Sequence, residues 1–267
     1  MKTVIITGSA RGFGYEMIKL FRHNNFNTVL CDINEEALKT AKENLLKENG
    51  EGIVLAIKAD VTNESDVQNL INETLDSVDT IDYFINNAGV NQPDKPIWEV
   101  DSKSIDRLIE IDLKGTIICS KLIMPVMIKQ GFGQIFNVEG YGSNDAVSVG
   151  LSLYGTTKRA VTYFTEALAN EAEKLNTGVY VGKITPGIMI TSFITTSLGD
   201  GDKIELPEKT KKVYNILGDY PETIANYIVP RLIKNDKNNA KIVWLTNFRA
   251  FTRFLTAGFN KRDFFKQ

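Results

Sequence analysis

The sequence predicts an α/β fold in three layers, in which helices cover both faces of a doubly wound parallel sheet of about seven strands. Short runs rich in β-branched residues alternate with longer segments whose apolar residues recur every three or four positions. Several of the short runs are apolar at consecutive positions, as strands are when both faces of a parallel sheet are buried. The 267 residues, 43% of them hydrophobic, suit one large domain.

Each predicted strand is short and is followed by a helical pattern. The strands cover residues 3–7, 28–32, 53–60, 81–86, 133–138, 179–185 and 240–245. The helical patterns cover residues 14–23, 34–48, 63–78, 106–130 and 156–175. We expect one domain over residues 1–246, with a substrate lid at about 188–220, and a separate aromatic and basic tail at 247–267.

Composition argues against several classes of function. A net charge of −2 and a pI near 5.7 favour no nucleic-acid partner. Cys31 and Cys119 lack metal-binding spacing, and His23 is the single histidine, so a histidine triad is excluded and no metal site is expected. No run reaches the roughly 18 apolar residues of a membrane span, and the N-terminus does not resemble a signal peptide. We therefore expect a cytoplasmic protein.

A glycine-rich turn, TGSARGFG at residues 7–14, links the first strand to the first helix. Gly8 permits a tight turn, Gly12 lets a pyrophosphate approach the backbone, and Gly14 allows close helix packing. The free N–H groups of the helix N-terminus suit phosphates. This arrangement is typical of a dinucleotide-binding Rossmann fold. The candidate cofactor-binding residues of this turn are Gly8, Ser9, Arg11, Gly12, Phe13 and Gly14.

The second strand ends in Asp32, whose carboxylate could accept hydrogen bonds from the hydroxyls of an adenosine ribose. Ile33 follows it as a further candidate contact. A carboxylate repels a 2′-phosphate, whereas Arg11 could pair with one. We favour NAD(H) over NADP(H), because a like-charge contact in a confined site costs more than an exposed arginine recovers. The alternative for Asp32 is an N-cap of the next helix, a role that Asn34 could also fill.

Tyr154 and Lys158 lie one helical turn apart, directly after the fifth predicted strand. A phenol has an ordinary pKa near 10 and is a poor acid or base at neutral pH, but a neighbouring ammonium stabilises the phenolate. The pair is therefore a candidate proton-transfer site. Tyr15 and Lys19 have the same spacing within the first helix, where we interpret it as a chance pair.

Five motifs in register resemble the short-chain dehydrogenase/reductase family: TGSARGFG, ADV at 59–61, NNAG at 86–89, YGTTK at 154–158 and PGIMIT at 186–191. The resemblance implies hydride transfer between a nicotinamide and a carbonyl or alcohol, with Tyr154 passing the proton and Lys158 also holding the nicotinamide ribose. It further implies cofactor contacts at Asp60, Val61, Asn87, Ala88, Gly89, Pro186, Gly187, Ile188 and Thr191.

Two positions depart from the family. Gly140 stands where a serine usually donates a hydrogen bond to the substrate, and Ser143 or the phenol of Tyr141 could replace it. A turn role is the alternative for Ser143. Asp112 stands where an asparagine is usual; if ionised beside Lys158, it would partly cancel the effect of the ammonium on Tyr154 and raise the working pH.

The segments around these departures, with the later YPETIANYIVPR stretch and the tail, are similar to the chlorophyll(ide) b reductase branch, which also has glycine at the serine position. We expect a small-molecule carbonyl or alcohol substrate, bulky and apolar, and a homodimer or homotetramer. A non-catalytic dinucleotide-binding protein is the alternative. For the tail we favour docking on its own domain or a second subunit over a membrane surface, through Phe248, Phe251, Phe254, Leu255 and Phe259.

Overall fold

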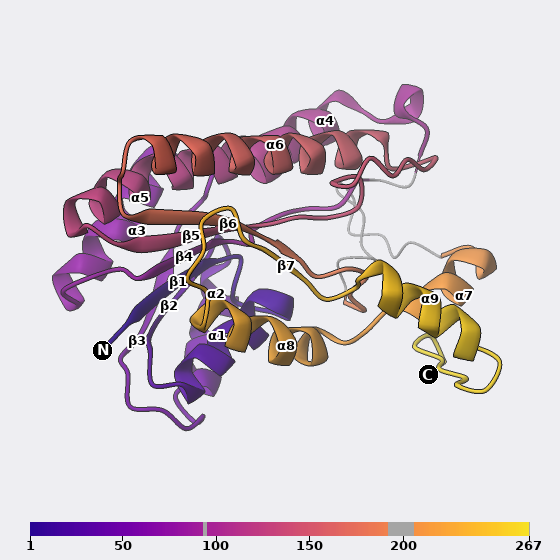
Figure 1. Ribbon diagram of the computed structural model, residues 1–267, viewed down its shortest axis with the longest axis horizontal. Helices are drawn as coiled ribbons and strands as arrows, with labels where there is room; N and C mark the ends of the chain where they lie inside the picture. The colour runs from indigo at the N-terminus through magenta and orange to yellow at the C-terminus, as the bar shows by residue number, and fades with distance from the viewer. Residues whose placement is uncertain (93–94, 192–205, 267) are drawn as a thin grey trace.

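The computed structural model describes residues 1–92, 95–191 and 206–266, and it confirms the predicted sheet (Figure 1). All strand pairs are parallel, in the order β3-β2-β1-β4-β5-β6-β7. The strands are β1 (Thr3–Thr7), β2 (Asn27–Asp32), β3 (Val54–Lys58), β4 (Tyr83–Asn86), β5 (Gly133–Val138), β6 (Val179–Thr185) and β7 (Lys241–Val243).

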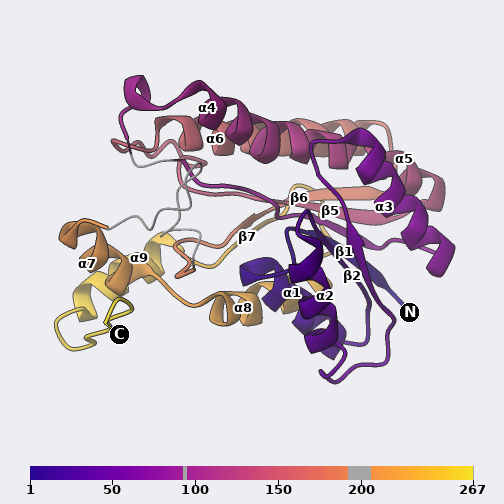
Figure 2. The same ribbon diagram turned by 180° about the vertical axis from the view of Figure 1, so that it is seen from behind.

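Helices cover both faces of the sheet, which gives the three expected layers (Figures 1 and 2). One face carries α1 (Gly12–His23), α2 (Glu35–Leu45) and α8 (Pro221–Ile233). The other carries α3 (Glu64–Ser77), α4 (Ser102–Leu108), α5 (Thr116–Gln130) and α6 (Ser152–Lys174). Beyond the carboxyl ends of the strands lie α7 (Glu208–Leu217) and α9 (Asn247–Thr256).

Strand β1 shows why the strands read as continuous apolar runs. Val4 and Ile6 point into the core beside α1, α2 and α8, whereas Ile5 points into the core beside α3 and α5. All three side chains are fully buried. Because side chains alternate across a strand, two cores require apolar residues at odd and even positions alike.

One helical prediction needs correction. The pattern at residues 106–130 suggested a single helix, but a π-helical segment, Ile109–Gly115, separates α4 from α5. A π-helical turn holds an extra residue, and such turns often occur at functional sites. Here it carries Asp112, whose side chain is completely buried.

The order of the strands fixes where a ligand can bind. Successive crossovers run outward from β1 to β3 and then return to β4 on the other side of β1. In sheets of this kind, ligands bind at the carboxyl edge where the order reverses. The turn after β1 and the segment after β4 meet at that edge, since Ala88 N donates to Thr7 Oγ1.

The tail forms α9 and a following segment that packs against α7. Its docking differs from the prediction. Arg253 and Arg262 form ion pairs with Asp219, whereas the apolar side chains that we expected to be buried are more than half exposed. Their burial against the chain's own domain is therefore wrong. Of the predicted lid at 188–220, residues 192–205 lie outside the described residues.

Candidate active site

The glycine-rich turn forms a tight cradle before α1. Gly8 and Gly12 both adopt φ +61°, a conformation that favours glycine. A Cβ on Gly8 would lie 2.8 Å from Ala88 Cα, and one on Gly14 would lie 2.7 Å from Asn87 Nδ2, so neither position has room for a side chain. No side chain caps the N-terminus of α1, where Arg11 is the N-cap residue. Its N–H groups and the bare glycine backbone fit a pyrophosphate.

Ser9, Phe13 and Asn87 support this turn through hydrogen bonds and packing. Ser9 Oγ donates to Ile6 O at 2.7 Å and accepts from Cys31 N at 3.0 Å, and the residue is fully buried. The Asn87 amide donates to the carbonyls of Thr7 and Gly8 at 2.9 and 3.0 Å. The Phe13 side chain packs in the core, so only the backbone of Phe13 remains for a phosphate.

The N-cap role at the end of β2 belongs to Asn34 and not to Asp32. Asn34 caps α2, since its Oδ1 accepts from Ala37 N at 2.9 Å. The Asp32 carboxylate accepts from Ala10 N at 3.3 Å and from Asn34 N at 3.1 Å. These bonds hold it beside the glycine-rich turn. The Ile33 side chain is 60% exposed next to it.

A cavity of about 560 Å³ adjoins the turn and α2. Arg11 lines it, together with polar side chains of α2 that include Thr40 and Asn44. It therefore offers space and hydrogen-bonding groups next to the position of Asp32.

The ADV motif follows β3 and forms a stabilised turn. Asp60 Oδ1 accepts from the backbone N and from the hydroxyl of Thr62 at 2.9 and 2.8 Å. Val61 is buried against Gly115. The Asp60 side chain is thus bonded within the turn and the Val61 side chain is packed in the interior. An adenine at this position would contact the backbone.

Tyr154, which is partly buried, forms a cluster at the start of α6 with the buried side chains of Lys158 and Asp112. Lys158 Nζ lies 5.5 Å from the centroid of the Tyr154 ring and 2.9 Å from Asp112 Oδ2. Asp112 Oδ1 accepts from Val90 N at 2.8 Å. Gly89 lies directly over the ion pair, because a Cβ there would be 3.3 Å from Asp112 Oδ2 and 3.5 Å from Lys158 Nζ.

Burial and charge act against each other in this cluster. Burial raises the pKa of Tyr154, the Lys158 ammonium lowers it, and Asp112 and Tyr214 raise it further, so the net pKa is raised. Burial alone would lower the pKa of Lys158, but Asp112 and Tyr154 outweigh it and the net pKa is raised. Burial also raises the pKa of Asp112, against the opposing effect of Lys158. A contact of 2.9 Å holds Lys158 as the ammonium.

The position of Gly140 has no room for a side chain such as the serine that is usual in the family. A Cβ there would overlap the Tyr154 hydroxyl and lie 3.0 Å from Tyr154 Cζ and 3.1 Å from Lys158 Cγ. The phenol thus occupies the space next to the glycine. Ser143 is buried; its hydroxyl accepts from Gly140 N at 3.2 Å and donates to Lys158 O at 3.3 Å. To act as a substitute donor, Ser143 would have to leave both partners, and the described geometry favours a supporting role.

Gln92 and Glu139 position the cluster and were not predicted from the sequence. Gln92 is buried, and its Oε1 accepts from the N–H groups of Leu153 and Tyr154, both at 2.9 Å. It therefore caps α6, which has no cap from its own N-cap residue. A glutamine 61 residues before Leu153 gives no local signal of this role.

The buried Glu139 carboxylate binds three elements next to Gly140. It accepts from Thr162 on α6 at 2.8 Å and from Thr185 at the end of β6 at 2.6 Å. It also pairs with Lys241 on β7 at 2.9 Å. An acidic residue at the end of an apolar strand was the available signal.

The PGIMIT segment follows β6 and is held by the segment before α8. Asp219 N donates to Ile188 O at 3.1 Å, and Ile190 N donates to Asp219 O at 2.9 Å. Pro186 is buried, Gly187 adopts φ +76°, and Thr191 is the last residue before a range that the structure does not describe.

Within the described ranges, no group of three or more His, Cys, Asp or Glu side chains could hold a metal ion. Cys31 and Cys119 are both free and buried, and burial raises the pKa of Cys119 to about 12. Among the same residues, no helix has the length and apolar character needed to cross a bilayer.

Comparison with known proteins identifies the family of the chain. A family model described as short chain dehydrogenase matches residues 2–201. The chlorophyll(ide) b reductase NOL of Oryza sativa subsp. japonica is 31% identical over 260 residues, which are 95% of this chain and 74% of that protein.

Solved structures share the fold. The structure of levodione reductase has a TM-score of 0.80 at 24% identity, covering 94% of this chain and 98% of the other. The 3-ketoacyl-(acyl-carrier-protein) reductase from Brucella melitensis, solved in complex with NADH, has a TM-score of 0.77 at 22% identity, covering 91% and 96%. Since the family model matches most of the chain and the site carries the five motifs, the chain belongs to the short-chain dehydrogenase/reductase family and is an NAD(P)-dependent oxidoreductase.

Proposed function

We propose that this chain interconverts a bulky, apolar ketone or aldehyde and the corresponding alcohol, with Tyr154 as the proton donor and acceptor and NAD(H) as the preferred cofactor. The observation that carries the proposal is the cluster of Tyr154, Lys158 and Asp112 beside Gly140, across the carboxyl edge of the sheet from the glycine cradle.

The proton chemistry follows from the cluster. A nicotinamide bound at this edge supplies or accepts the hydride. In reduction the Tyr154 phenol donates its proton to the carbonyl oxygen, and in oxidation the phenolate removes the proton of the alcohol. The Lys158 ammonium stabilises the phenolate in both directions, and Asp112 keeps Lys158 charged and fixed in place.

Asp32 supports the preference for NAD(H). Its carboxylate is held by two backbone N–H groups beside the glycine-rich turn, where an adenosine ribose binds in this fold. The negative charge would repel a 2′-phosphate at short range in a confined site. Arg11 lines the neighbouring cavity but is exposed, so its attraction for a phosphate is screened more strongly.

Apolar side chains on the loops near Tyr154 support a bulky apolar substrate. Trp98, in the segment after β4, is 82% exposed, and Val147 and Val149, in the segment before α6, are 91% and 85% exposed. These segments follow the strands whose ends form the site. A substrate of the size that the names of the chlorophyll(ide) b reductases imply would cover such side chains.

A non-catalytic dinucleotide-binding protein is the competing proposal, and the departures at Gly140 and Asp112 favour it. One experiment separates the two. The purified chain is mixed with NADH or NADPH and a panel of hydrophobic ketones, and Tyr154→Phe is compared with Tyr163→Phe. Tyr163 is a matched control because it is an exposed tyrosine on the same helix.

We expect Tyr154→Phe to lower kcat by about 10²–10⁴-fold, as the loss of a general acid does, and to leave NADH binding intact by fluorescence titration. Tyr163→Phe should match the wild type. Cofactor binding without turnover in the wild type, or equal turnover in both variants, would favour the non-catalytic protein.

A further inference from the structure

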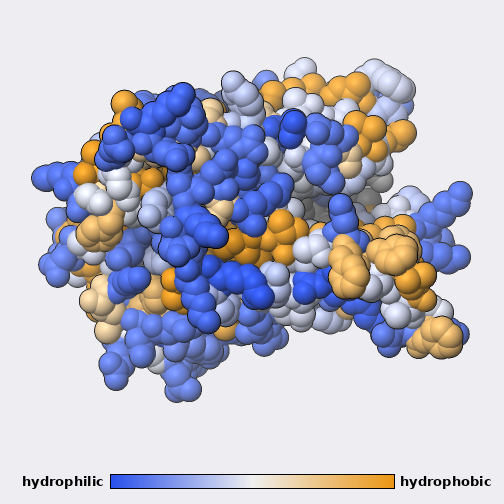
Figure 3. Space-filling model, in the orientation of Figure 1, coloured by the Kyte–Doolittle hydropathy of each residue, from blue (hydrophilic) through white to orange (hydrophobic). Residues whose placement is uncertain are grey.

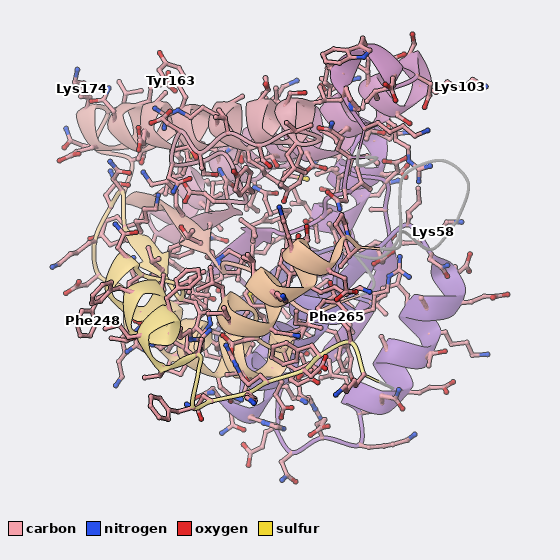
Figure 4. The ribbon with its side chains drawn as sticks, turned by 90° about the vertical axis from the view of Figure 1, so that its right-hand side faces the viewer. Lys58, Lys103, Tyr163, Lys174, Phe248 and Phe265 are labelled. Carbon is pink, nitrogen blue, oxygen red and sulfur yellow. The ribbon has the colours of Figure 1, made fainter. Side chains whose placement is uncertain are left out.

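The outward side of α9, together with Phe259 just after it, exposes apolar side chains that we name the aromatic face. Figure 3 shows apolar side chains gathered over this end of the molecule, and in Figure 4 Phe248 lies at the outer edge of the helix. The exposed fractions of its side chains are 77% for Phe248, 60% for Phe251, 52% for Phe254, 64% for Leu255 and 94% for Phe259.

The arginines on the opposite side of α9 keep this face turned outward. Arg253 pairs with Asp219 at 2.5 Å and donates to Leu217 O at 3.0 Å. The guanidinium of Arg249 lies 3.7 Å from the Trp244 ring. Rolling the helix to bury its phenylalanines would break these contacts and remove Arg253 from Asp219, a carboxylate that is only 7% exposed.

The segment after α9 adds a second anchor. Arg262 pairs with the other Asp219 oxygen at 3.1 Å and donates to Gly218 O at 3.0 Å. Phe264 packs edge-on against Tyr220, with ring centroids 5.1 Å apart. The aromatic face is therefore presented by a helix fixed at both ends, and its exposure is a property of the folded chain.

The size of the aromatic face calls for a partner. With roughly 200 Å² for a whole aromatic side chain, the exposed fractions correspond to about 600–700 Å² of apolar surface. That is at or above the largest patch on a typical monomeric protein, about 300–600 Å².

The charge of the tail indicates what kind of partner fits. Residues 247–267 contain five basic side chains and one acidic side chain, a net charge of +4, whereas the remaining residues contain 26 basic and 32 acidic side chains, a net charge of −6. Lys261 is exposed two residues after Phe259, and Lys266 is exposed near the end of the tail, where it pairs with Asp263 at 3.8 Å. An apolar helix face bordered by cations is complementary to the interface of an anionic bilayer.

We propose that the aromatic face and the adjoining lysines bind the surface of an anionic lipid membrane, with α9 lying in the plane of the interface. A second copy of the chain fits less well. A two-fold contact through this face would bring two tails of charge +4 together, and the face is smaller than the roughly 800 Å² per partner of a standard interface. The helix also lies at the end of the molecule, where a flat surface can reach it (Figures 1 and 2).

Vesicle co-sedimentation of the full-length protein tests the proposal. The vesicles are pure phosphatidylcholine or phosphatidylcholine with 30% phosphatidylserine, each at 0.1 M and 0.5 M NaCl. The variants are Phe248→Ser/Phe251→Ser, which removes part of the aromatic face, and Lys261→Glu/Lys266→Glu, which reverses the adjoining charge. The matched control is Tyr163→Ser/Leu175→Ser, since both side chains are 75% exposed and belong to α6 and its C-cap, and Figure 4 shows α6 on the other side of the sheet from α9. Serine and phenylalanine have similar helix propensities, and thermal unfolding verifies each fold.

We expect wild type to bind the anionic vesicles and to bind less at 0.5 M NaCl. The phenylalanine pair should lower the partition coefficient about tenfold or more, the lysine pair should remove the preference for anionic lipid, and the control should match wild type. Absence of wild-type binding, or equal binding by the phenylalanine pair, would overturn the proposal. A dimer that the phenylalanine pair dissociates, seen by light scattering without lipid binding, would assign the face to a second copy instead.

Discussion

Asp112→Asn tests whether the buried carboxylate sets the working pH of Tyr154. The carboxylate lies 2.9 Å from Lys158 Nζ, which lies 5.5 Å from the Tyr154 ring centroid, so carboxylate and ring are within roughly 8 Å of each other. At an effective dielectric constant of about 20, a unit charge at that distance contributes about 2 kcal/mol. Because Asp112 is one of the groups that raise the pKa of Tyr154, removing its charge should lower that pKa.

The rate depends on pH in opposite ways in the two directions of the reaction. Reduction requires the phenol, so its rate is full below the pKa of Tyr154 and falls as the pH rises through it. Oxidation requires the phenolate, so its rate rises through the same pKa. Because Asp112 raises this pKa, Asp112→Asn should move the limb of both profiles to lower pH. Asparagine is the usual residue of the family here, so the variant should keep a working lysine.

The assay is kcat/KM against pH in both directions, with Glu110→Gln as the matched control. Glu110 is an exposed acid in the same π-helical segment, and its substitution removes the same formal charge. A limb that stays within about 0.3 units in Asp112→Asn, or an equal shift in Glu110→Gln, would refute the assigned role, since only the buried charge is close and weakly screened.

Three further substitutions have expected outcomes. Gly140→Ala should lower kcat by about 10²-fold, because the new Cβ displaces the Tyr154 phenol. Gly155→Ala should leave kcat unchanged, because its Cβ would have ordinary contacts of 3.6 Å or more. Higher activity in Gly140→Ser would contradict this expectation. Gln92→Leu should lower the free energy of unfolding by about 1–2 kcal/mol in urea titrations, through loss of the cap on α6, and Gln92→Glu, which keeps the acceptor, should not. Asp32→Asn should raise the NADPH-to-NADH ratio of kcat/KM about tenfold or more, and Glu35→Gln, an exposed neighbour, should leave it unchanged.

The sheet could be predicted from the sequence because its signal is local. Burial on both faces leaves apolar residues at every position of a strand such as β1, and the predicted bounds 3–7, 133–138 and 179–185 agree with the structure. The π-helical turn around Asp112 has no such signal, since its apolar spacing continues the helical pattern of its neighbours. Likewise, the cap on α6 comes from Gln92, which is remote in sequence.

Burial of the tail's phenylalanines against the chain's own domain was predicted incorrectly for a related reason. Its helical spacing correctly gathered phenylalanines on one side of α9, and the usual preference for buried aromatic side chains suggested that this side would dock. In the structure the tail instead docks on Asp219, a largely buried carboxylate that pairs with Arg253 and Arg262 and accepts a hydrogen bond from the Trp244 indole. Because an unpaired buried carboxylate costs several kcal/mol, the arginine side of α9 faces Asp219 and the phenylalanine side faces outward.

Asp219 also links the segment after β6, beside the candidate active site, to the tail that carries the aromatic face. Its backbone pairs with Ile188 and Ile190 in the segment that follows β6, and its side chain holds Arg253 and Arg262 of the tail. The preceding helix, α7, carries Tyr214, which lies close enough to Tyr154 to raise its pKa. The backbone of Asp219 thus holds the segment beside the candidate cofactor site, its side chain holds the tail, and Arg253 of the tail contacts the end of α7 at Leu217 O. A tail held by a lipid surface would consequently hold the opening of the site close to that surface, where an apolar substrate is most concentrated.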